Sequence, residues 1–450
     1  MVRFTLILSL SFIYILQAFV KSDTLEVIFT IVAVTLFLTM LPLLDLKGRL
    51  FTLTLFLLGM IIHFAVGDTG IGLFEGITQN MALLAIIILA PLLSIPLKRE
   101  GIIETVVSYL NEMKSNPQKI YLGLTSFMLA LSPVLNMGAL RIVHGFVENI
   151  KIPSRFLSRS YFVGFTHANI WSPFFASVGI VLYYMEMTYL SYVLVGVIFA
   201  ILQIAVGVFL FRPRNLEVFN EVAVSAEVYD KTGRKKDLTK LLIFVFGLVF
   251  LLIVLEQIFR ISMLLLVTII CVMIPMLWFF LRWKTSIVKE EMHLYKDKLL
   301  TQSKTEICMF LSAGLFGNAI SHTPVKDFIE QIMQWSATQS VGILFLFILL
   351  FVTVMAFMGV HQIIVTPLIL ISLNFAEIEI SQVTIAFMCM FSWMLAAAIS
   401  PLNALNIIVS QCVKKDGLTV AFRWNGKYFL VVTTIAFIYV FILDWTKHLF

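Results

Sequence analysis

The fold is decided by Ala168-Asn169-Ile170-Trp171-Ser172-Pro173-Phe174-Phe175-Ala176, a Ser-Pro break inside apolar sequence. The same pattern returns about 230 residues later as Ala396-Ala397-Ala398-Ile399-Ser400-Pro401-Leu402-Asn403-Ala404. Met137-Gly138 precedes the first copy, and Met358-Gly359 precedes the second. The chain therefore carries an internal repeat, and proline interrupts both of its copies.

The composition around these breaks is that of a membrane protein. Apolar residues make up 60% of the 450-residue chain and charged residues 13%, against roughly 45–50% and 25% in soluble domains. The mean hydropathy is +1.00. Apolar runs such as 241–259 and 263–281 are long enough to cross the hydrocarbon layer. We therefore expect a polytopic helical protein of the cytoplasmic membrane whose main partner is the lipid bilayer.

The net charge of +6 does not indicate a nucleic-acid partner. The basic residues occupy short loops between apolar runs, as the positive-inside rule predicts for cytoplasmic loops. The cysteines are Cys271, Cys308, Cys389 and Cys412, and they lack the spacing of a metal site. Free cysteines of this kind are usually small buried packing residues.

Basic residues on both flanks of the segment 120–150 predict a hairpin that enters and leaves from the cytoplasmic side. Lys119 precedes the segment and Lys151 follows it, so a single spanning helix would place one of them on the wrong side. Pro133 and Gly138 lie near the middle of the segment, where the chain would turn.

The second half repeats this plan with reversed charges. Glu330 precedes the segment 341–373 and Glu377 follows it, with few basic residues nearby. This hairpin is therefore predicted to enter from the outer side. The following segment, 383–413, then runs inward to a cluster of basic residues.

These patterns predict an all-α polytopic membrane protein with about 11 transmembrane helices, two re-entrant hairpins and two inverted-topology repeats with broken helices. The predicted parts are N-terminal scaffold helices over 1–97; a first repeat over 98–213 with its hairpin at 120–150 and its broken helix at 161–184; a cytoplasmic linker over 214–240; scaffold helices over 241–305; and a second repeat over 306–450 with its hairpin at 341–373 and its broken helix at 383–413.

Broken helices favour binding because they expose backbone polar groups inside the membrane. A break survives there only where protein or water satisfies the freed groups. Freed amides attract anions, whereas freed carbonyls attract Na⁺ or a proton. A Pro kink without any binding role is the alternative for each single Ser-Pro pair, and the matched pair favours a site.

Polar residues at the predicted tips and breaks are the candidate ligands, because intramembrane polar groups are expensive and functional. Arg141 can hold a carboxylate or phosphate with two parallel hydrogen bonds. Alternatively, it pairs with Glu148, another carboxylate or backbone carbonyls, or extends toward the cytoplasm. The predicted substrate contacts are Gly138, Arg141, Thr166, His167, Ser172, Gly359, His361, Gln362 and Ser400. The predicted coupling-ion ligands are Asn136, Asn169, Asn403 and Asn406.

The substrate is predicted to be a small anion. The hairpins and broken helices contain no Asp, and Glu256 lies near a predicted span end, where we expect it to be interfacial. A cation–proton antiporter usually needs a buried carboxylate that titrates. His167 or His361 would carry the proton if H⁺ were the coupling ion. The chain has no Walker, His-Glu-x-x-His, Cys-x-x-Cys or Gly-x-Ser-x-Gly motif, so we expect no cofactor and no enzymatic activity.

The plan of hairpin and broken helix, repeated in inverted form, resembles the ion transporter superfamily, which includes divalent anion/sodium symporters, citrate carriers and arsenite permease relatives. The likeness rests on Asn136-Met137-Gly138, Ser172-Pro173, Met358-Gly359 and Ser400-Pro401-Leu402-Asn403. It implies a homodimer and elevator-like movement of a transport part against a scaffold part. The sodium-coupled members carry Ser-Asn-Thr at the hairpin tips, and this chain does not, so both Na⁺ and H⁺ stay open as the coupling ion.

The sequence therefore predicts an ion-coupled secondary transporter of a small anion, with a carboxylate as the expected substrate. An exporter or antiporter of an anion or metalloid is the alternative within transport. A membrane enzyme acting on a lipid-linked substrate, with His and Arg as acid and base, and a non-transporting sensor whose loop 212–240 binds a partner are the alternatives from other classes.

Overall fold

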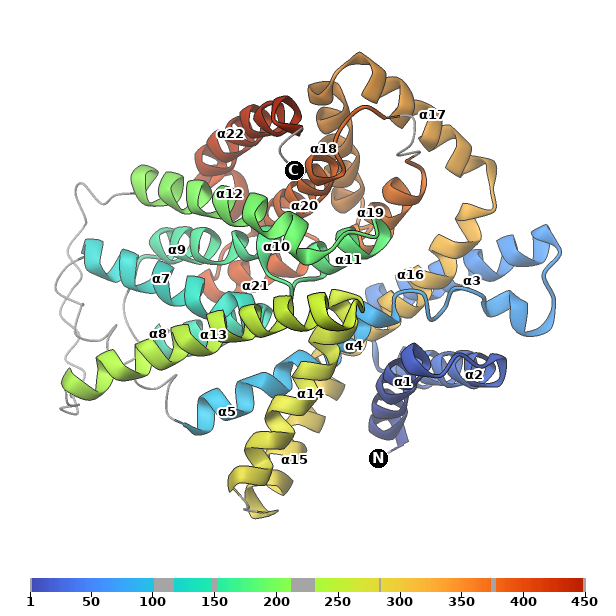
Figure 1. The fold of residues 1–450 in the computed structure, drawn as a ribbon, viewed down its shortest axis with the longest axis horizontal. Helices are drawn as coiled ribbons and strands as arrows, with labels where there is room; N and C mark the ends of the chain where they lie inside the picture. The colour runs from blue at the N-terminus through green and yellow to red at the C-terminus, as the bar shows by residue number, and fades with distance from the viewer. Residues whose placement is uncertain are drawn as a thin grey trace. The chain divides into compact units, whose positions relative to one another are not determined.

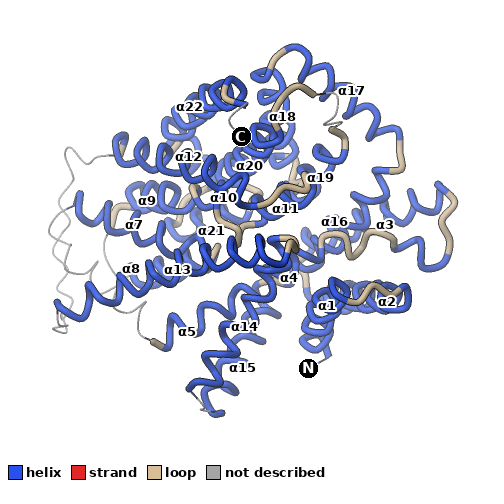
Figure 2. Tube along the Cα trace, viewed as in Figure 1, coloured by secondary structure: helices blue, strands red, loops and turns tan. Residues whose placement is uncertain are grey.

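The computed structural model describes residues 2–100, 117–147, 152–211, 231–282, 285–373 and 378–447. Within these ranges 85% of the residues are helical and none lies in a strand, and Figure 2 shows the short loops that join the helices. The predicted all-α class is therefore confirmed for the described part of the chain. Most of the predicted linker over 214–240 and the residue Glu148 lie outside it.

Seven of the described helices are long and apolar enough to cross a membrane. They span Asp23–Leu43, Leu46–Val66, Met81–Arg99, Tyr189–Leu210, Met263–Arg282, Gln382–Val413 and Gly426–Trp445. Shorter apolar helices cover Val2–Gln17, Lys119–Leu135, Ile243–Phe259, Val341–Phe357 and Gln362–Ile371. The chain thus has the helices of a multi-pass membrane protein, and the predicted total of about 11 spans stays a prediction.

The helices fall into two compact units. Unit 1 contains residues 1–95, 261–334 and 367–374, and unit 2 contains residues 96–260, 335–366 and 375–450. The predicted scaffold segments 1–97 and 241–305 lie mainly in unit 1, although the helix that begins the second of them belongs to unit 2.

Unit 1 is built around two helices that approach closely. Its main helices are α1 (Val2–Phe19), α2 (Asp23–Met40), α3 (Leu46–Val66), α4 (Met81–Leu89), α14 (Met263–Arg282), α15 (Thr285–Gln302) and α16 (Lys304–Ser321) (Figure 1). Gly59 lets α3 approach α16, because a Cβ there would lie 2.9 Å from Leu315. At the C-terminal end of α3, His63 Nδ1 is hydrogen-bonded to the carboxylate of Asp68 at 2.8 Å.

Unit 2 contains the predicted first hairpin, the predicted second hairpin as far as Thr366, and both predicted breaks. Its helices are α7 (Pro117–Leu135), α8 (Met137–Val147), α9 (Ser154–Thr166), α10 (Ala168–Trp171), α11 (Ala176–Tyr184), α12 (Tyr189–Leu210), α13 (Lys231–Phe259), α18 (Val341–Phe357), the start of α19 (Gln362–Ile371), α20 (Gln382–Ile399), α21 (Ala404–Val413) and α22 (Gly426–Trp445). A π-helical stretch, Thr419–Trp424, precedes α22. α5 (Ser94–Arg99) and α17 (Pro324–Gln339) cross the boundary between the units.

The helices that flank the first break, and the helix after the second, pack against helices that are distant in sequence. α10 and α11 pack against α20, and α21 packs against α8 and α9. α18 packs against α20 and α22. Sequence segments that lie more than two hundred residues apart therefore meet inside one unit, and this arrangement positions the polar groups described next.

Candidate functional site

Each predicted hairpin turns at one residue with left-handed backbone geometry. In the first, Asn136 has φ +50° between α7 and α8, and its Oδ1 accepts a hydrogen bond from the N–H of Met137 at 2.8 Å. In the second, Gly359 has φ +90° between α18 and α19. Asparagine and glycine are the residues that adopt this geometry most readily. The turn of the first hairpin is therefore at Asn136, and Gly138 already belongs to the first turn of α8.

The two breaks have nearly the same backbone conformation. Ser172 has φ −75° and ψ 127°, and Ser400 has φ −73° and ψ 124°. Each serine precedes a proline, which disfavours helical geometry in the residue before it. Each serine carbonyl then accepts a hydrogen bond from the N–H three residues further on, at 3.0 Å in the first break and 3.1 Å in the second.

A serine side chain fastens each hairpin tip to its break. The Ser172 hydroxyl donates to the carbonyl of Pro133 at 2.6 Å, and the Ser400 hydroxyl donates to the carbonyl of Ala356 at 2.8 Å. Both serines are fully buried. In each case the accepting carbonyl lies three residues before the left-handed residue of the tip. Two segments that share little sequence thus form the same tip-and-break unit.

After each break, a side chain on the next helix donates a hydrogen bond to a backbone carbonyl that has lost its helical partner. The Ser177 hydroxyl donates to the carbonyl of Asn169 at 2.6 Å, and the Asn406 amide donates to the carbonyl of Ala398 at 2.9 Å. Donor and acceptor are eight residues apart in both. A carbonyl freed inside a membrane needs a hydrogen-bond donor. At both breaks a protein side chain is that donor.

Two residues that the sequence did not single out for a site, Tyr189 and Glu256, support the first break. The Tyr189 hydroxyl donates to the carbonyl of Trp171 at 2.6 Å, and both carboxylate oxygens of Glu256 accept from the backbone N–H of Tyr189 at 3.0 Å. Glu256 is only 5% exposed and lies near the C-terminal end of α13, so its carboxylate is enclosed by protein, and an interfacial level stays a prediction. It is buried because it satisfies the first N–H of α12, a group that lacks a helical partner.

A relay of hydrogen bonds fixes the orientation of Gln362 beside the second break. The N–H of Leu405 donates to Asn403 Oδ1 at 3.3 Å, and Asn403 Nδ2 donates to Gln362 Oε1 at 2.8 Å. The Gln362 amide nitrogen is therefore left as a donor, and it has no hydrogen-bond partner in the described structure. Gln362 is 0% exposed. An unpaired buried donor costs free energy, so this group indicates a place for a ligand.

Two further unpartnered polar atoms belong to the same tip-and-break units. Thr366 lies one helical turn after Gln362 on α19, and its buried hydroxyl has no partner among the described residues. In the first repeat, Asn169 is 5% exposed and its amide nitrogen is likewise unpartnered within the described ranges. Each repeat thus contributes a buried amide donor next to a helix break.

His361 is the predicted histidine that uses only one ring nitrogen, Nδ1, in a hydrogen bond to the described part of the chain. Its Nδ1 accepts from the N–H of Ile363 at 3.2 Å, so the ring proton is on Nε2. The ring stands edge-on to Trp393, with 6.0 Å between centroids, and the residue is half-buried. His361 therefore presents an N–H donor at the N-terminal end of α19.

Thr166 and His167 instead make contacts within the protein. Trp171 Nε1 donates to His167 Nδ1 at 3.1 Å, and His167 Nε2 lies 3.1 Å from the carbonyl of Gly164. Thr166 donates to Phe162 and accepts from the Gln203 amide, each at 2.7 Å. The sequence analysis does not identify Gln203, although a glutamine inside a 22-residue apolar helix is a signal for buried pairing.

The remaining predicted residues lie at the first tip or inside the second break. Arg141 is exposed on α8, the helix that packs against α21. Asn136, Asn403 and Asn406 each already use their side-chain oxygen as an acceptor, from Met137, Leu405 and Ser410. The structure thus gathers Gln362, Asn403, Ser400, Gly359 and His361 at the second break, and Ser172 and Asn169 at the first.

No cluster of three or more His, Cys, Asp or Glu suited to a metal ion occurs in the described part of the chain. Compared with known proteins, the chain matches no family model and no curated sequence. The function therefore has to be argued from the geometry above.

Proposed function

We propose that the protein is an ion-coupled secondary transporter of a small anion in the cytoplasmic membrane, built from two inverted-topology repeats. The observation that carries the proposal is the pair of serine bonds, Ser172 to Pro133 and Ser400 to Ala356. Duplicated discontinuous helices at a repeat interface are where secondary transporters bind their substrates. A simple proline kink needs no partner from a second, separate hairpin.

The second break is the part of the site best suited to an anion. Gln362 begins α19, so its unpartnered amide N–H lies at the positive end of a ten-residue helix. Thr366 adds a hydroxyl, and His361 adds its Nε2–H. These groups are donors, and donors held in a dry environment favour negative charge. The Asn169 amide and Arg141 would complete the ligand set from the first repeat.

The inverted arrangement supplies a means of alternating access. If hairpin one enters from the cytoplasmic side and hairpin two from the outer side, each tip closes the site toward one side of the membrane. Elevator-like movement of the repeat unit in a homodimer is the form of this mechanism that the family resemblance implies. Na⁺ and H⁺ both remain candidates for the coupling ion.

The proposal is tested first by ligand binding. Thermal unfolding of the purified protein in detergent would be followed with succinate, citrate, sulfate or phosphate, each with Na⁺ or choline as the cation. A bound anion raises stability by mass action. Gln362→Ala should weaken binding of the stabilising anion by about tenfold or more, because a hydrogen bond to a charged group is lost. The matched control is Gln257→Ala, which removes the same group from the exposed surface of α13.

Transport is tested next in proteoliposomes with the anion that binds. Uptake should exceed equilibrium when a Na⁺ or H⁺ gradient is imposed, and Gln362→Ala should reduce it in proportion to the loss of binding. If anion uptake only reaches equilibrium under either gradient, transport is not coupled to Na⁺ or H⁺. Equal anion affinity in Gln362→Ala and wild type would remove the second break from the substrate site.

A further inference from the structure

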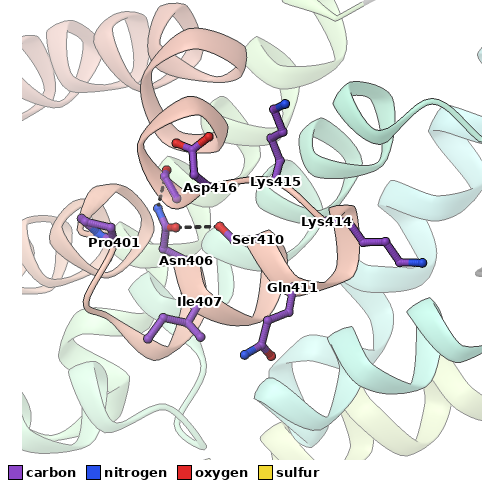
Figure 3. A pocket seen from close by; sticks show the side chains of 9 residues that line it. Pro401, Asn406, Ile407, Ser410, Gln411, Lys414, Lys415 and Asp416 are labelled. Carbon is purple, nitrogen blue, oxygen red and sulfur yellow. Dashed lines mark hydrogen bonds between the residues drawn. The ribbon is translucent and has the colours of Figure 1, made fainter. Parts of the chain in front are cut away.

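A cavity of about 360 Å³ lies at the C-terminal end of α21, and its lining does not include Gln362, Thr366 or His361, the residues proposed to hold the anion at the second break. It is lined by Pro401, Asn406, Ile407, Ser410, Gln411, Lys414, Lys415, Asp416 and Gly417 (Figure 3). These residues form one stretch that runs from the second break to the basic loop after α21. The cavity is large enough for the head group of a lipid or a small organic anion.

Asn406 braces the inner wall of this cavity. Its Nδ2 donates to the carbonyls of Ala398 at 2.9 Å and Gly417 at 3.3 Å, and its Oδ1 accepts from the Ser410 hydroxyl at 3.0 Å. Figure 3 shows the bonds to Ser410 and Gly417. Asn406 therefore links the loop that closes the cavity to a carbonyl freed by the second break. A ligand that holds the loop at Gly417 in place therefore also stabilises the second break through Asn406.

The rim of the cavity is positively charged. Lys414 and Lys415 are exposed, and their side chains extend away from Asn406 (Figure 3). Asp416 offsets part of this charge, but its carboxylate accepts from the N–H of Thr419 at 2.8 Å and so caps the helix that follows. Arg423 on that helix is also exposed. The mouth of the cavity therefore attracts anions.

Large apolar side chains are exposed directly beside this basic rim. Leu402 and Ile407 flank the cavity on the side of the break, and Leu418 and Phe422 follow it on the next helix. In a protein with seven membrane-length apolar helices, exposed apolar side chains of this kind are suited to contact with acyl chains. Basic groups next to lipid-facing apolar groups mark the level of the lipid phosphates, where basic pockets between helices bind anionic head groups.

We propose that this cavity binds the phosphate of an anionic phospholipid, with Lys414 and Lys415 holding the phosphate and Ser410 and Gln411 facing the rest of the head group. The acyl chains lie along Leu418, Phe422 and Ile407. Through Asn406, the bound lipid stabilises the second helix break. This inference needs a membrane location and does not depend on the transport proposal.

The test compares lipids that differ in head-group charge alone. The purified full-length protein in detergent is titrated with phosphatidylglycerol or with phosphatidylcholine of the same acyl chains, and the melting temperature is followed. Phosphatidylglycerol should raise the melting temperature more. In the Lys414→Gln/Lys415→Gln variant its midpoint concentration should rise about 25-fold, since each lysine near anionic lipid contributes about fivefold.

The matched control is Lys47→Gln/Lys98→Gln, which removes two exposed lysines near the ends of α3 and α5, outside the cavity, and should leave the midpoint unchanged. An unchanged midpoint in the Lys414/Lys415 variant would place the lipid elsewhere and overturn the proposal. Glycerol phosphate and inorganic phosphate serve as head-group probes without acyl chains. If either matches phosphatidylglycerol at equal concentration, the cavity takes a free anion and the lipid assignment is wrong.

Discussion

At the scale of single residues, the site depends on side chains that replace lost backbone hydrogen bonds. Ser172 and Ser400 each donate a hydroxyl to a carbonyl on a hairpin tip, and both are fully buried. A buried polar group without a partner costs more than a hydrogen bond gains. These serines therefore matter for stability as well as for shaping the site.

Ser172→Ala should destabilise the protein by about 1–3 kcal/mol, because it removes the side-chain donor to the buried Pro133 carbonyl. Ser400→Ala should cost about 0.5–1.5 kcal/mol, because the Ala356 carbonyl still accepts from the N–H of Gly359 at 3.2 Å. The shift in unfolding in detergent measures this effect. Thr434→Ala is the matched control, since Thr434 is exposed and bonds only within its own helix. A loss no larger than that of Thr434→Ala would show that the serine bonds contribute nothing to stability.

Gly417 should not tolerate a side chain. A Cβ there would lie 2.4 Å from Asn406 Oδ1 and 3.0 Å from the Pro401 Cβ, so Gly417→Ala should cost about 1–3 kcal/mol through forced displacement. Gly247→Ala on α13 meets nothing within 4 Å and should be neutral or slightly stabilising. The melting temperature should therefore fall in Gly417→Ala and stay the same or rise slightly in Gly247→Ala. A stable Gly417→Ala protein would mean that the loop has room to move away from Asn406.

At the scale of elements, each hairpin depends on one left-handed residue and each broken helix on one Ser-Pro pair. Asn136 and Gly359 occupy the turns, with φ of +50° and +90°. The turns differ in sequence, yet each places its accepting carbonyl where a serine from the break reaches it. Turn geometry, rather than a shared motif, gives the two tips the same hydrogen bond to a break serine.

Substitution at the turns should follow backbone geometry. Asn136→Gly should keep the fold, whereas Asn136→Val and Gly359→Val should each lose about 1–2 kcal/mol, the usual cost of left-handed geometry for such residues. Unfolding in detergent gives the comparison. Equal stability of Asn136→Gly and Asn136→Val would argue that the first hairpin does not turn at this position.

At the scale of the whole molecule, the proposal requires the two repeats to have opposite orientations. The charge pattern makes this prediction, because basic residues flank the first hairpin and acidic residues flank the second. The same fold with both hairpins on one side could not close the site alternately. Orientation in the membrane is thus the property on which the mechanism depends.

Cysteine labelling in cells tests this orientation. Ser154→Cys on α9 and Thr338→Cys on α17 are both exposed, and a Cys412→Ala background removes the one native cysteine that is not buried. A membrane-impermeant maleimide should label Thr338→Cys in intact cells and Ser154→Cys only after permeabilisation. Labelling of both from the same side would contradict the inverted repeats.

Much of the candidate site was predictable because proline, glycine and polar residues are conspicuous in apolar sequence. The sequence indicated the breaks at Ser172 and Ser400 and identified Gln362 as a candidate substrate contact, and its role in binding stays a prediction. Thr166 and His167 were indicated on the same grounds, yet both make their hydrogen bonds within the protein. Sequence reveals that a polar group sits among apolar ones, but it does not reveal which partner the group finds.

The sequence by itself determined the all-helical class, the membrane-length apolar helices and the positions of the two breaks, because hydrophobic length and proline act locally. Only the tertiary structure decided that Glu256 is buried against the start of α12, that each serine reaches a tip carbonyl, and that the relay through Asn403 leaves the Gln362 donor unpaired. These outcomes depend on partners far away in the chain, and hydrogen bonding between distant segments is fixed by packing alone.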